Sequence, residues 1–141
     1  MKISTKGRYA LRLMLDVALH SHGAAVPLRD VAQRQEISEK YLESIIRTLV
    51  KAKVVESLRG KGGGYRLTRK PQEYTLGEIL RLTEGSLAPV ACVEEHGSEC
   101  PNRSVCPTPP VWQKLDALIN NFLDSITLAD LMAPQNTKES S

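Results

Sequence analysis

The stretch Arg59-Gly60-Lys61-Gly62-Gly63-Gly64-Tyr65 decides how the first half of this chain folds. It separates two short apolar runs, 54–58 and 65–68, and a glycine-rich connection between such runs predicts a β-hairpin. Glycine permits positive φ and a close approach to phosphates, while Arg59 and Lys61 would supply counter-charge or enter a minor groove. A nucleotide-binding loop is excluded, because no Ser or Thr follows Lys61. We predict a DNA-contacting wing, with an ordinary flexible hairpin as the alternative.

Three helices are predicted upstream of the hairpin, at 5–20, 28–35 and 39–52. Ser4 and Ser38 precede the first and the third and are typical N-caps. The inward stripe predicted for the first helix is Leu11, Met14, Leu15, Ala18 and Leu19. A short helix, a tight turn and a further helix form a helix-turn-helix, and the hairpin directly after it makes the module winged.

The third helix is the predicted recognition helix, because the N-terminal end of the second helix of such a motif points into the major groove. Ser and Lys can donate to phosphates or bases, Glu can accept from cytosine N4, and Tyr can do either. Glu39 lies in this first turn, and the residues predicted to contact DNA from it are Ser38, Lys40, Tyr41, Glu43, Ser44 and, one turn further along, Arg47.

The charge is divided unevenly along the chain. Residues 1–70 hold 15 Lys and Arg against 6 Asp and Glu, whereas residues 71–141 hold 4 against 10. This asymmetry predicts a polyanion-binding half joined to a half with another task, although a solvated basic surface would also explain it. No run approaches the ~20 apolar residues that span a bilayer, and the N-terminus lacks a signal peptide's apolar region. We therefore expect a cytoplasmic protein with no membrane partner.

The second half begins with a helix predicted at 76–83, capped by Thr75. A loop rich in Gly, Pro, Ser, Glu and Cys is predicted from 85 to 110. A long helix then begins near Pro109 and ends near Ser125. It carries a seam whose spacing is typical of helix–helix packing, formed by Trp112, Leu115, Ile119, Phe122 and Ile126. A short capped helix at 127–132 and a disordered tail at 134–141 complete the chain.

Three cysteines, Cys92, Cys100 and Cys106, lie within one short loop, and the chain has no others. An odd number cannot all pair, and clustered thiols in a cytosolic chain favour a metal or redox site. Their spacing matches neither the paired knuckles of a zinc ribbon nor the run of a bacterial ferredoxin. Three thiolates can still bind one face of a small cluster, with a fourth ligand from elsewhere. A zinc site completed by His96 and a clusterless thiol switch are the alternatives.

Several stretches together resemble one known family. They are Lys6-Gly7-Arg8-Tyr9-Ala10, Ile37-Ser38, Tyr41-Leu42-Glu43, the wing Arg59-Gly60-x-Gly62-Gly63-Gly64-Tyr65, Val111-Trp112 and Ser125-Ile126-Thr127-Leu128-x-Asp130-Leu131. On these residues the chain is similar, over nearly its whole length, to the IscR-like (Rrf2) family of bacterial transcription regulators. The resemblance implies a homodimer whose long C-terminal helices cross, and an iron–sulfur cluster in the cysteine loop that tunes which operators are bound. It assigns DNA contacts to Ser38, Lys40, Tyr41, Glu43, Arg59 and Gly60.

The chain departs from the family pattern at the fourth cluster ligand. IscR has a histidine three residues after its last cysteine, where this chain has Pro109. Some nitric-oxide-sensing relatives use an acidic residue near the N-terminus of the partner subunit, where this chain has Arg8. Loop residues that could coordinate instead are Glu94, Glu95, His96 and Glu99. We favour a [2Fe–2S] cluster, with [4Fe–4S] as the alternative.

The predicted fold is mainly α with a small β-hairpin wing. It comprises a winged helix-turn-helix domain (1–70), a connecting helix (71–86), a cluster-binding loop (87–108), a dimerisation helix (109–132) and a disordered tail (133–141). The predicted function is a homodimeric transcription regulator, a repressor, that senses cluster, redox or nitric oxide status and binds pseudo-palindromic double-stranded DNA. The alternatives are the same fold responding to a metabolite, a partner protein or thiol oxidation, and a zinc-stabilised DNA-binding protein. A redox enzyme is disfavoured, because the chain has no C-x-x-C motif and no cofactor fingerprint.

Overall fold

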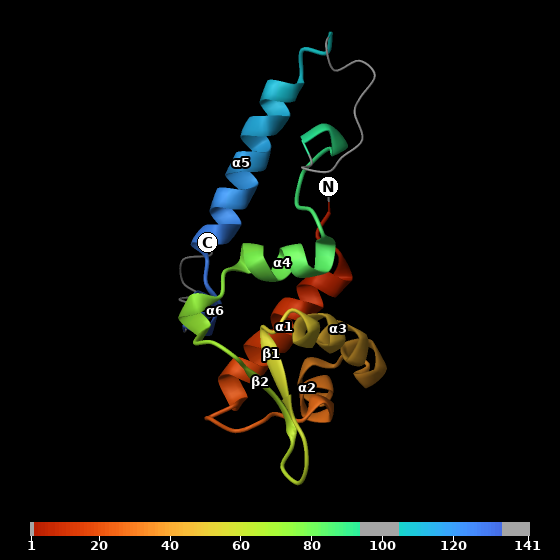
Figure 1. The fold of residues 1–141 in the computed structure, drawn as a ribbon, viewed down its shortest axis with the longest axis vertical. Helices are drawn as coiled ribbons and strands as arrows, with labels where there is room; N and C mark the ends of the chain where they lie inside the picture. Colours follow the sequence, from red (N-terminus) through yellow and green to blue (C-terminus); the bar gives the residue numbers. More distant parts are fainter. Residues whose placement is uncertain (1, 94–104, 134–141) are drawn as a thin grey trace, which may run out of the picture.

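A computed structural model of the chain describes residues 2–93 and 105–133. The helices are α1 (Thr5–His20), α2 (Leu28–Gln35), α3 (Glu39–Lys51), α4 (Leu76–Glu84), α5 (Pro109–Ser125) and α6 (Leu128–Met132), with short 3-10 turns η1 (Pro71–Glu73) and η2 (Ala91–Val93). The strands β1 (Val55–Leu58) and β2 (Gly64–Leu67) pair antiparallel. The predicted fold class, mainly helical with one small hairpin, is confirmed (Figure 1).

Helices α1, α2 and α3 pack with the hairpin into a head around one apolar core. Ser4 Oγ accepts a hydrogen bond from the Gly7 N–H at 3.1 Å, and Ser38 Oγ accepts one from the Tyr41 N–H at 3.1 Å. Both predicted N-caps are therefore present, and each satisfies a backbone donor that the first helical turn leaves unpaired. The side chains that fill the core between these helices are almost fully buried, among them Leu13, Met14, Leu42, Ile45 and Leu49.

The buried face of α1 differs from the predicted stripe. The core takes up Ala10, Leu13, Met14 and Val17, while Leu19 is 42% exposed. Leu11, Leu15 and Ala18 are partly buried against the core. The cause is that α1 contacts α2, α3 and β2 as well as α4 and α6, so its apolar surface is wider than one stripe.

The hairpin is anchored to the head by a third backbone segment. Val26 and Tyr65 exchange two backbone hydrogen bonds of 2.8 and 2.9 Å, which extends the β1–β2 ladder by one bridge. Gly64 lies where a Cβ would overlap the Val26 carbonyl, so this close approach requires a glycine. β1 begins one residue later than the predicted run, and β2 begins and ends one residue earlier than its predicted run.

The C-terminal part leaves the head and returns to it. Helix α4 lies across α1, and α5 extends away from the head (Figure 1). After α5 the chain pairs with the segment before α4, through Leu76 N–H to Ile126 O at 2.9 Å and Leu128 N–H to Tyr74 O at 3.0 Å. Leu128 is only 1% exposed, so α6 anchors the C-terminal end of α5 to the head. Within the described residues, no helix is both long and apolar enough to cross a membrane.

Candidate nucleic-acid interface

The predicted recognition residues share the solvent side of α3. Leu42, Ile45, Ile46 and Leu49 point into the core. Exposed residues on the other side of the helix form what we call the reading face: Lys40, Tyr41, Glu43, Ser44 and Arg47. Ser38 caps the helix and is itself exposed. The fold therefore brings all of the predicted α3 residues to one surface.

The start of α3 is held in place by α1. The Tyr9 and Tyr41 rings meet edge to face with centroids 5.7 Å apart, an arrangement favoured by the ring quadrupoles. The Arg12 guanidinium lies 5.2 Å from the centre of the Tyr9 ring. It also donates to the Gln35 carbonyl at 2.5 Å, just before the turn of the motif. The contacts of Tyr9 with Tyr41 and of Arg12 with Gln35 could not be predicted from the sequence, because each joins residues more than twenty positions apart.

A buried carboxylate fixes α2 against α1. Asp16 is 1% exposed and accepts three hydrogen bonds from Arg34, the shortest 2.7 Å, and one from Gln35 at 2.9 Å. Burial by itself would raise the pKa of the Asp16 carboxyl, but these hydrogen bonds and the charge of Arg34 outweigh it and lower that pKa. The charged pair therefore locks the first helix of the motif in position.

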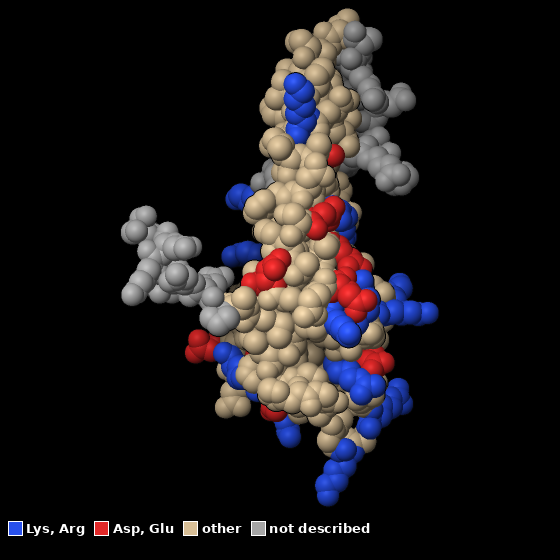
Figure 2. Space-filling model, turned by 90° about the vertical axis from the view of Figure 1, so that its left-hand side faces the viewer, with Lys and Arg blue, Asp and Glu red and all other residues tan. Residues whose placement is uncertain are grey.

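The wing is a tight glycine turn with a basic tip. Gly60 and Gly62 have φ of 98° and 79°, which a side chain would strain, and Gly63 N–H donates to Gly60 O at 2.9 Å. Arg59 and Lys61 are exposed on either side of Gly60. Figure 2 shows Lys and Arg gathered around the end of the molecule that holds the head and wing, whereas the protruding end is mostly uncharged on this face.

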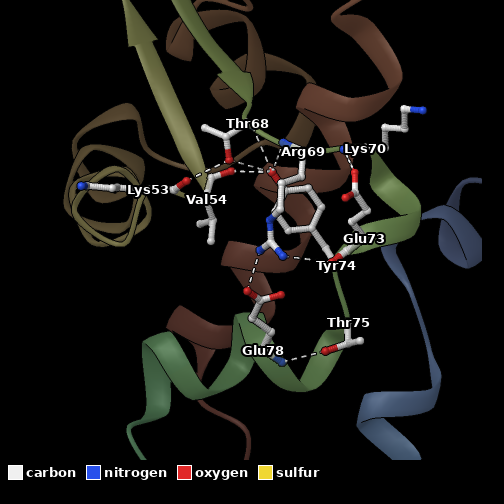
Figure 3. A network of polar contacts seen from close by, with 9 residues as sticks. All are labelled: Lys53, Val54, Thr68, Arg69, Lys70, Glu73, Tyr74, Thr75 and Glu78. Atoms are coloured by element: carbon white, nitrogen blue, oxygen red, sulfur yellow. Dashed lines mark hydrogen bonds and ion pairs between the residues drawn. The ribbon is translucent and has the colours of Figure 1, made fainter.

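The base of the wing is held by the buried Tyr74, whose contacts with its neighbours Figure 3 shows. Its hydroxyl donates to Val54 O at 2.7 Å and accepts from the N–H groups of Thr68 and Arg69 at 3.0 and 2.9 Å, so all its capacity is used. The Arg69 guanidinium lies 4.3 Å from the centre of the Tyr74 ring and donates to Glu78 of α4 at 2.5 Å. The wing therefore shares an anchor with α4.

A groove of about 310 Å³ lies between the reading face and the wing strand. It is lined by Leu28, Glu39, Glu43, Ile46, Arg47 and Tyr65. Two of the predicted recognition residues, Glu43 and Arg47, thus face the hairpin across a cleft. The head presents one continuous surface made of α3, this groove and the wing.

The cysteine loop is described at its two ends. Cys92 lies in η2 and Cys106 just before α5, and both thiols are partly exposed. Cys100 and the candidate ligands Glu94, Glu95, His96 and Glu99 lie outside the described residues. η2 packs against α5, which places the segments bearing Cys92 and Cys106 at the same end of the molecule. Among the described residues, no three potential metal ligands are grouped.

The Cys106 thiol has a hydrogen-bond partner in Thr108. Its Sγ lies 3.0 Å from Thr108 Oγ1. The hydrogen bonds from the Thr108 side chain and backbone lower the pKa of the Cys106 thiol. A thiolate is the form that binds metals and reacts with oxidants.

The comparisons with known proteins agree with this architecture. A family model described as Rrf2, iron-dependent transcriptional regulator, matches residues 3–134. The chain belongs to the Rrf2 family. It is 43% identical, over 140 residues, to the HTH-type transcriptional regulator IscR of Aliivibrio salmonicida, with 99% of this chain and 82% of that protein covered.

Solved structures of the Rrf2 family match this chain closely. T. potens IscR matches with a TM-score of 0.76 and 36% identity, covering 100% of this chain and 93% of that one. CymR, the global cysteine regulator of B. subtilis, matches with a TM-score of 0.75 and 37% identity, covering 93% of this chain and 95% of that one. This Rrf2 protein is therefore a DNA-binding transcription regulator and not an enzyme, as predicted.

Proposed function

We propose that this Rrf2 protein acts as a homodimeric repressor whose operator binding depends on an iron–sulfur cluster. The observation that carries the proposal is that the winged head packs against α4, that α4 packs against the exposed apolar helix α5, and that α5 packs against the turn that carries Cys92. Residues 1–70 would bind DNA, 87–108 the cluster, and 109–132 the second subunit. A two-fold dimer would bind pseudo-palindromic sites with recognition helices about one helical turn apart.

Contacts to DNA are proposed for the reading face together with Ser38, and for the wing residues Arg59, Gly60, Lys61 and Gly62. The exposed side chains on α3 have the donors and acceptors that read base edges in the major groove. The wing tip offers two cations and a backbone free of side chains, which suits a narrow minor groove. Each element is rigidly held, α3 by Tyr9 and the wing by Tyr74.

We expect Arg59→Ala to weaken operator binding by about 1–3 kcal/mol if the guanidinium reads bases. If it contacts only phosphate, the main change is instead a smaller dependence of binding on salt. Fluorescence anisotropy on labelled operator and on mixed-sequence DNA, at several salt concentrations, separates the two. Arg29→Ala, at the exposed start of α2, is the charge-matched control. Unchanged affinity and salt dependence for Arg59→Ala would remove this residue from the interface.

The proposed dimer contact is an apolar stripe on α5. All of α5 is described, and it contains no buried residue. The stripe consists of Val111, Leu115, Leu118 and Phe122, which are 58%, 37%, 67% and 62% exposed. Leu115 and Phe122 belong to the seam predicted from the sequence, whereas Trp112, Ile119 and Ile126 are half-buried. Exposed apolar residues at three- and four-residue spacing are typical of a helix that packs against a second helix.

The cysteines suit an iron–sulfur cluster by their chemistry. Cys106 has a lowered thiol pKa, Cys92 and Cys106 are partly accessible, and both flank the segment that carries Cys100. Thiolates are the usual ligands of such clusters, and we favour [2Fe–2S] over [4Fe–4S]. When bound, the cluster would supply a centre that responds to redox state, iron supply or nitric oxide.

Helix α4 offers a route from the loop to the head. Its last residue, Glu84, accepts hydrogen bonds from Ser4 N–H at 3.1 Å and Ser4 Oγ at 2.5 Å, at the start of α1. Arg81 donates to both Asp124 oxygens on α5 at 2.9 Å. A change in the loop that follows Gly85 would therefore shift the placement of the head relative to α5.

The cluster is tested by purifying the protein without oxygen and measuring its visible absorption with iron and sulfide content. We expect a coloured protein whose cluster is lost in Cys106→Ala. Ser86→Ala, which removes a hydroxyl near the loop and no thiol, should retain the colour. A colourless wild-type protein with stoichiometric zinc would contradict the cluster and favour the zinc alternative.

A second candidate trigger is oxidation of Cys106, favoured by its exposure and its lowered pKa. In that case the wild-type protein would be colourless and metal-free, and mild peroxide would change its DNA affinity in a way that Cys106→Ala abolishes. A response to a metabolite or partner protein would survive Cys106→Ala.

A further inference from the structure

A second groove lies on the other side of α3 from the wing. It has a volume of about 500 Å³ and is lined by Thr5, Tyr9, Glu36, Ile37, Ser38 and Tyr41. We call it the α1–α3 groove. Four of these six residues carry a hydroxyl group, which can donate to a phosphate oxygen.

Two arginines contact residues that line the α1–α3 groove. Arg8 is exposed, and its Nη2 donates to Thr5 Oγ1 at 3.2 Å. Arg12 lies 5.2 Å from the centre of the Tyr9 ring. The first turn of α1 has no acidic residue and carries Lys6 instead. Cations at a helix N-terminus oppose the helix dipole, so the stability of α1 does not account for them.

The α1–α3 groove lies on the side of α3 where the second backbone of a DNA duplex would run. A major groove is about 12 Å wide and has a phosphate backbone along each side. On one side of the reading face lies the wing, across the 310 Å³ groove lined by Glu43 and Tyr65. On the other side lies α1, where Tyr9 contacts Tyr41. A helix inserted there would therefore have one backbone on its wing side and the other on its α1 side.

We propose that the α1–α3 groove binds a backbone phosphate of the DNA strand opposite the wing, with Thr5, Arg8 and Tyr9 as its donors. The inference rests on the proposed DNA contacts of α3 and extends them to a helix outside the helix-turn-helix motif. Glu36 is the acidic residue of this groove, and its charge opposes a phosphate there. Removing the charge of Glu36 and removing that of Arg8 should therefore have opposite effects.

The test measures binding of the full-length protein to a mixed-sequence DNA duplex at several salt concentrations. A phosphate contact needs no particular sequence, so this probe is sufficient. For Arg8→Ala, the slope of log affinity against log salt should fall in magnitude by about 0.9 for each head that is engaged. Tyr9→Phe keeps the ring contacts with Tyr41 and should weaken binding about fivefold. Glu36→Gln should tighten binding about threefold.

The control is Lys70→Ala, which removes one positive charge from the same head at the base of the hairpin. Its slope should equal that of the wild type. The wild type could bind DNA while Arg8→Ala leaves the salt slope unchanged and Glu36→Gln does not raise the affinity. That result overturns this inference and leaves the proposed function standing. A slope change in Lys70→Ala equal to that in Arg8→Ala also overturns it, because the effect would then be one of net charge. A wild-type protein that fails to bind DNA overturns the proposed function as well.

Discussion

Replacing Asp16 with Ala should lower the free energy of unfolding by about 3 kcal/mol and the melting temperature by about 10 °C. The carboxylate side chain is completely buried and neutralises Arg34, so its loss leaves a guanidinium without its partner and Gln35 without its acceptor. Breaking a buried pair costs about 3–5 kcal/mol, and the lower end applies because Arg34 is 35% exposed. Chemical denaturation followed by circular dichroism measures the change. Since such domains are stable by about 5–15 kcal/mol, the loss is a large fraction of the total.

The same variant should also change how stability depends on pH. The pKa of Asp16 is lower in the folded protein than in the unfolded chain, so its contribution is complete above the unfolded value of about 4. That contribution is lost as pH falls through the folded pKa. Wild-type stability should therefore decline on acidification below about pH 4 more steeply than that of Asp16→Ala. Asp30→Ala, which removes a partly exposed carboxylate from α2, should cost less than about 1 kcal/mol. Equal stabilities of wild type and Asp16→Ala would show that the pair contributes nothing.

The elements of this fold could be predicted from the sequence where their signals are local. A cap hydrogen bond joins residues three positions apart, and the predicted caps Ser4, Ser38 and Thr75 all make it. The glycine-rich stretch likewise predicted the position of the wing, because the positive φ at Gly60 and Gly62 is a conformation that glycine itself allows. Helix periodicity then placed the reading face on the exposed side of α3.

What the sequence could not show depends on contacts between distant residues. The stripe predicted for α1 was wrong in including Leu19 and in omitting Leu13 and Val17. Periodicity assumes one narrow buried stripe, whereas α1 contacts α2, α3 and β2 as well as α4 and α6. The role of Tyr74 could not be predicted, because the three partners of its hydroxyl depend on how the hairpin packs against the segment before α4. The sequence shows Asp16 among the apolar residues of α1, but its partner Arg34 could be identified only from the packing of α2.

The candidate site divides in the same way. Periodicity along α3 groups the reading face without any tertiary information, whereas the α1–α3 groove exists only because α1 crosses the start of α3. For the cysteines, spacing identifies clustered thiols but not their fourth ligand. That ligand depends on which side chains the folded loop brings near them.

Phe122→Glu should convert the proposed dimer into a monomer. Phe122 is 62% exposed on α5 and lies in line with Leu115 and Leu118, so in a paired helix its ring would be buried. A carboxylate there would be buried without a partner, and we expect the dimer to dissociate at least about 100-fold more readily. Light scattering after gel filtration measures the mass, and circular dichroism checks that the head, whose core does not include Phe122, remains folded.

The matched control for this variant is Gln113→Glu, which adds the same charge to an exposed position on the same helix. It lies two residues from Val111, about 200° around α5, and so outside the stripe. It should remain a dimer. Because each head holds its own reading face, monomeric Phe122→Glu should still contact a half-site but lose the gain from binding two linked half-sites, which reaches about 100-fold or more. If Phe122→Glu stays dimeric, the stripe is not the interface, and the two heads must be joined through another surface.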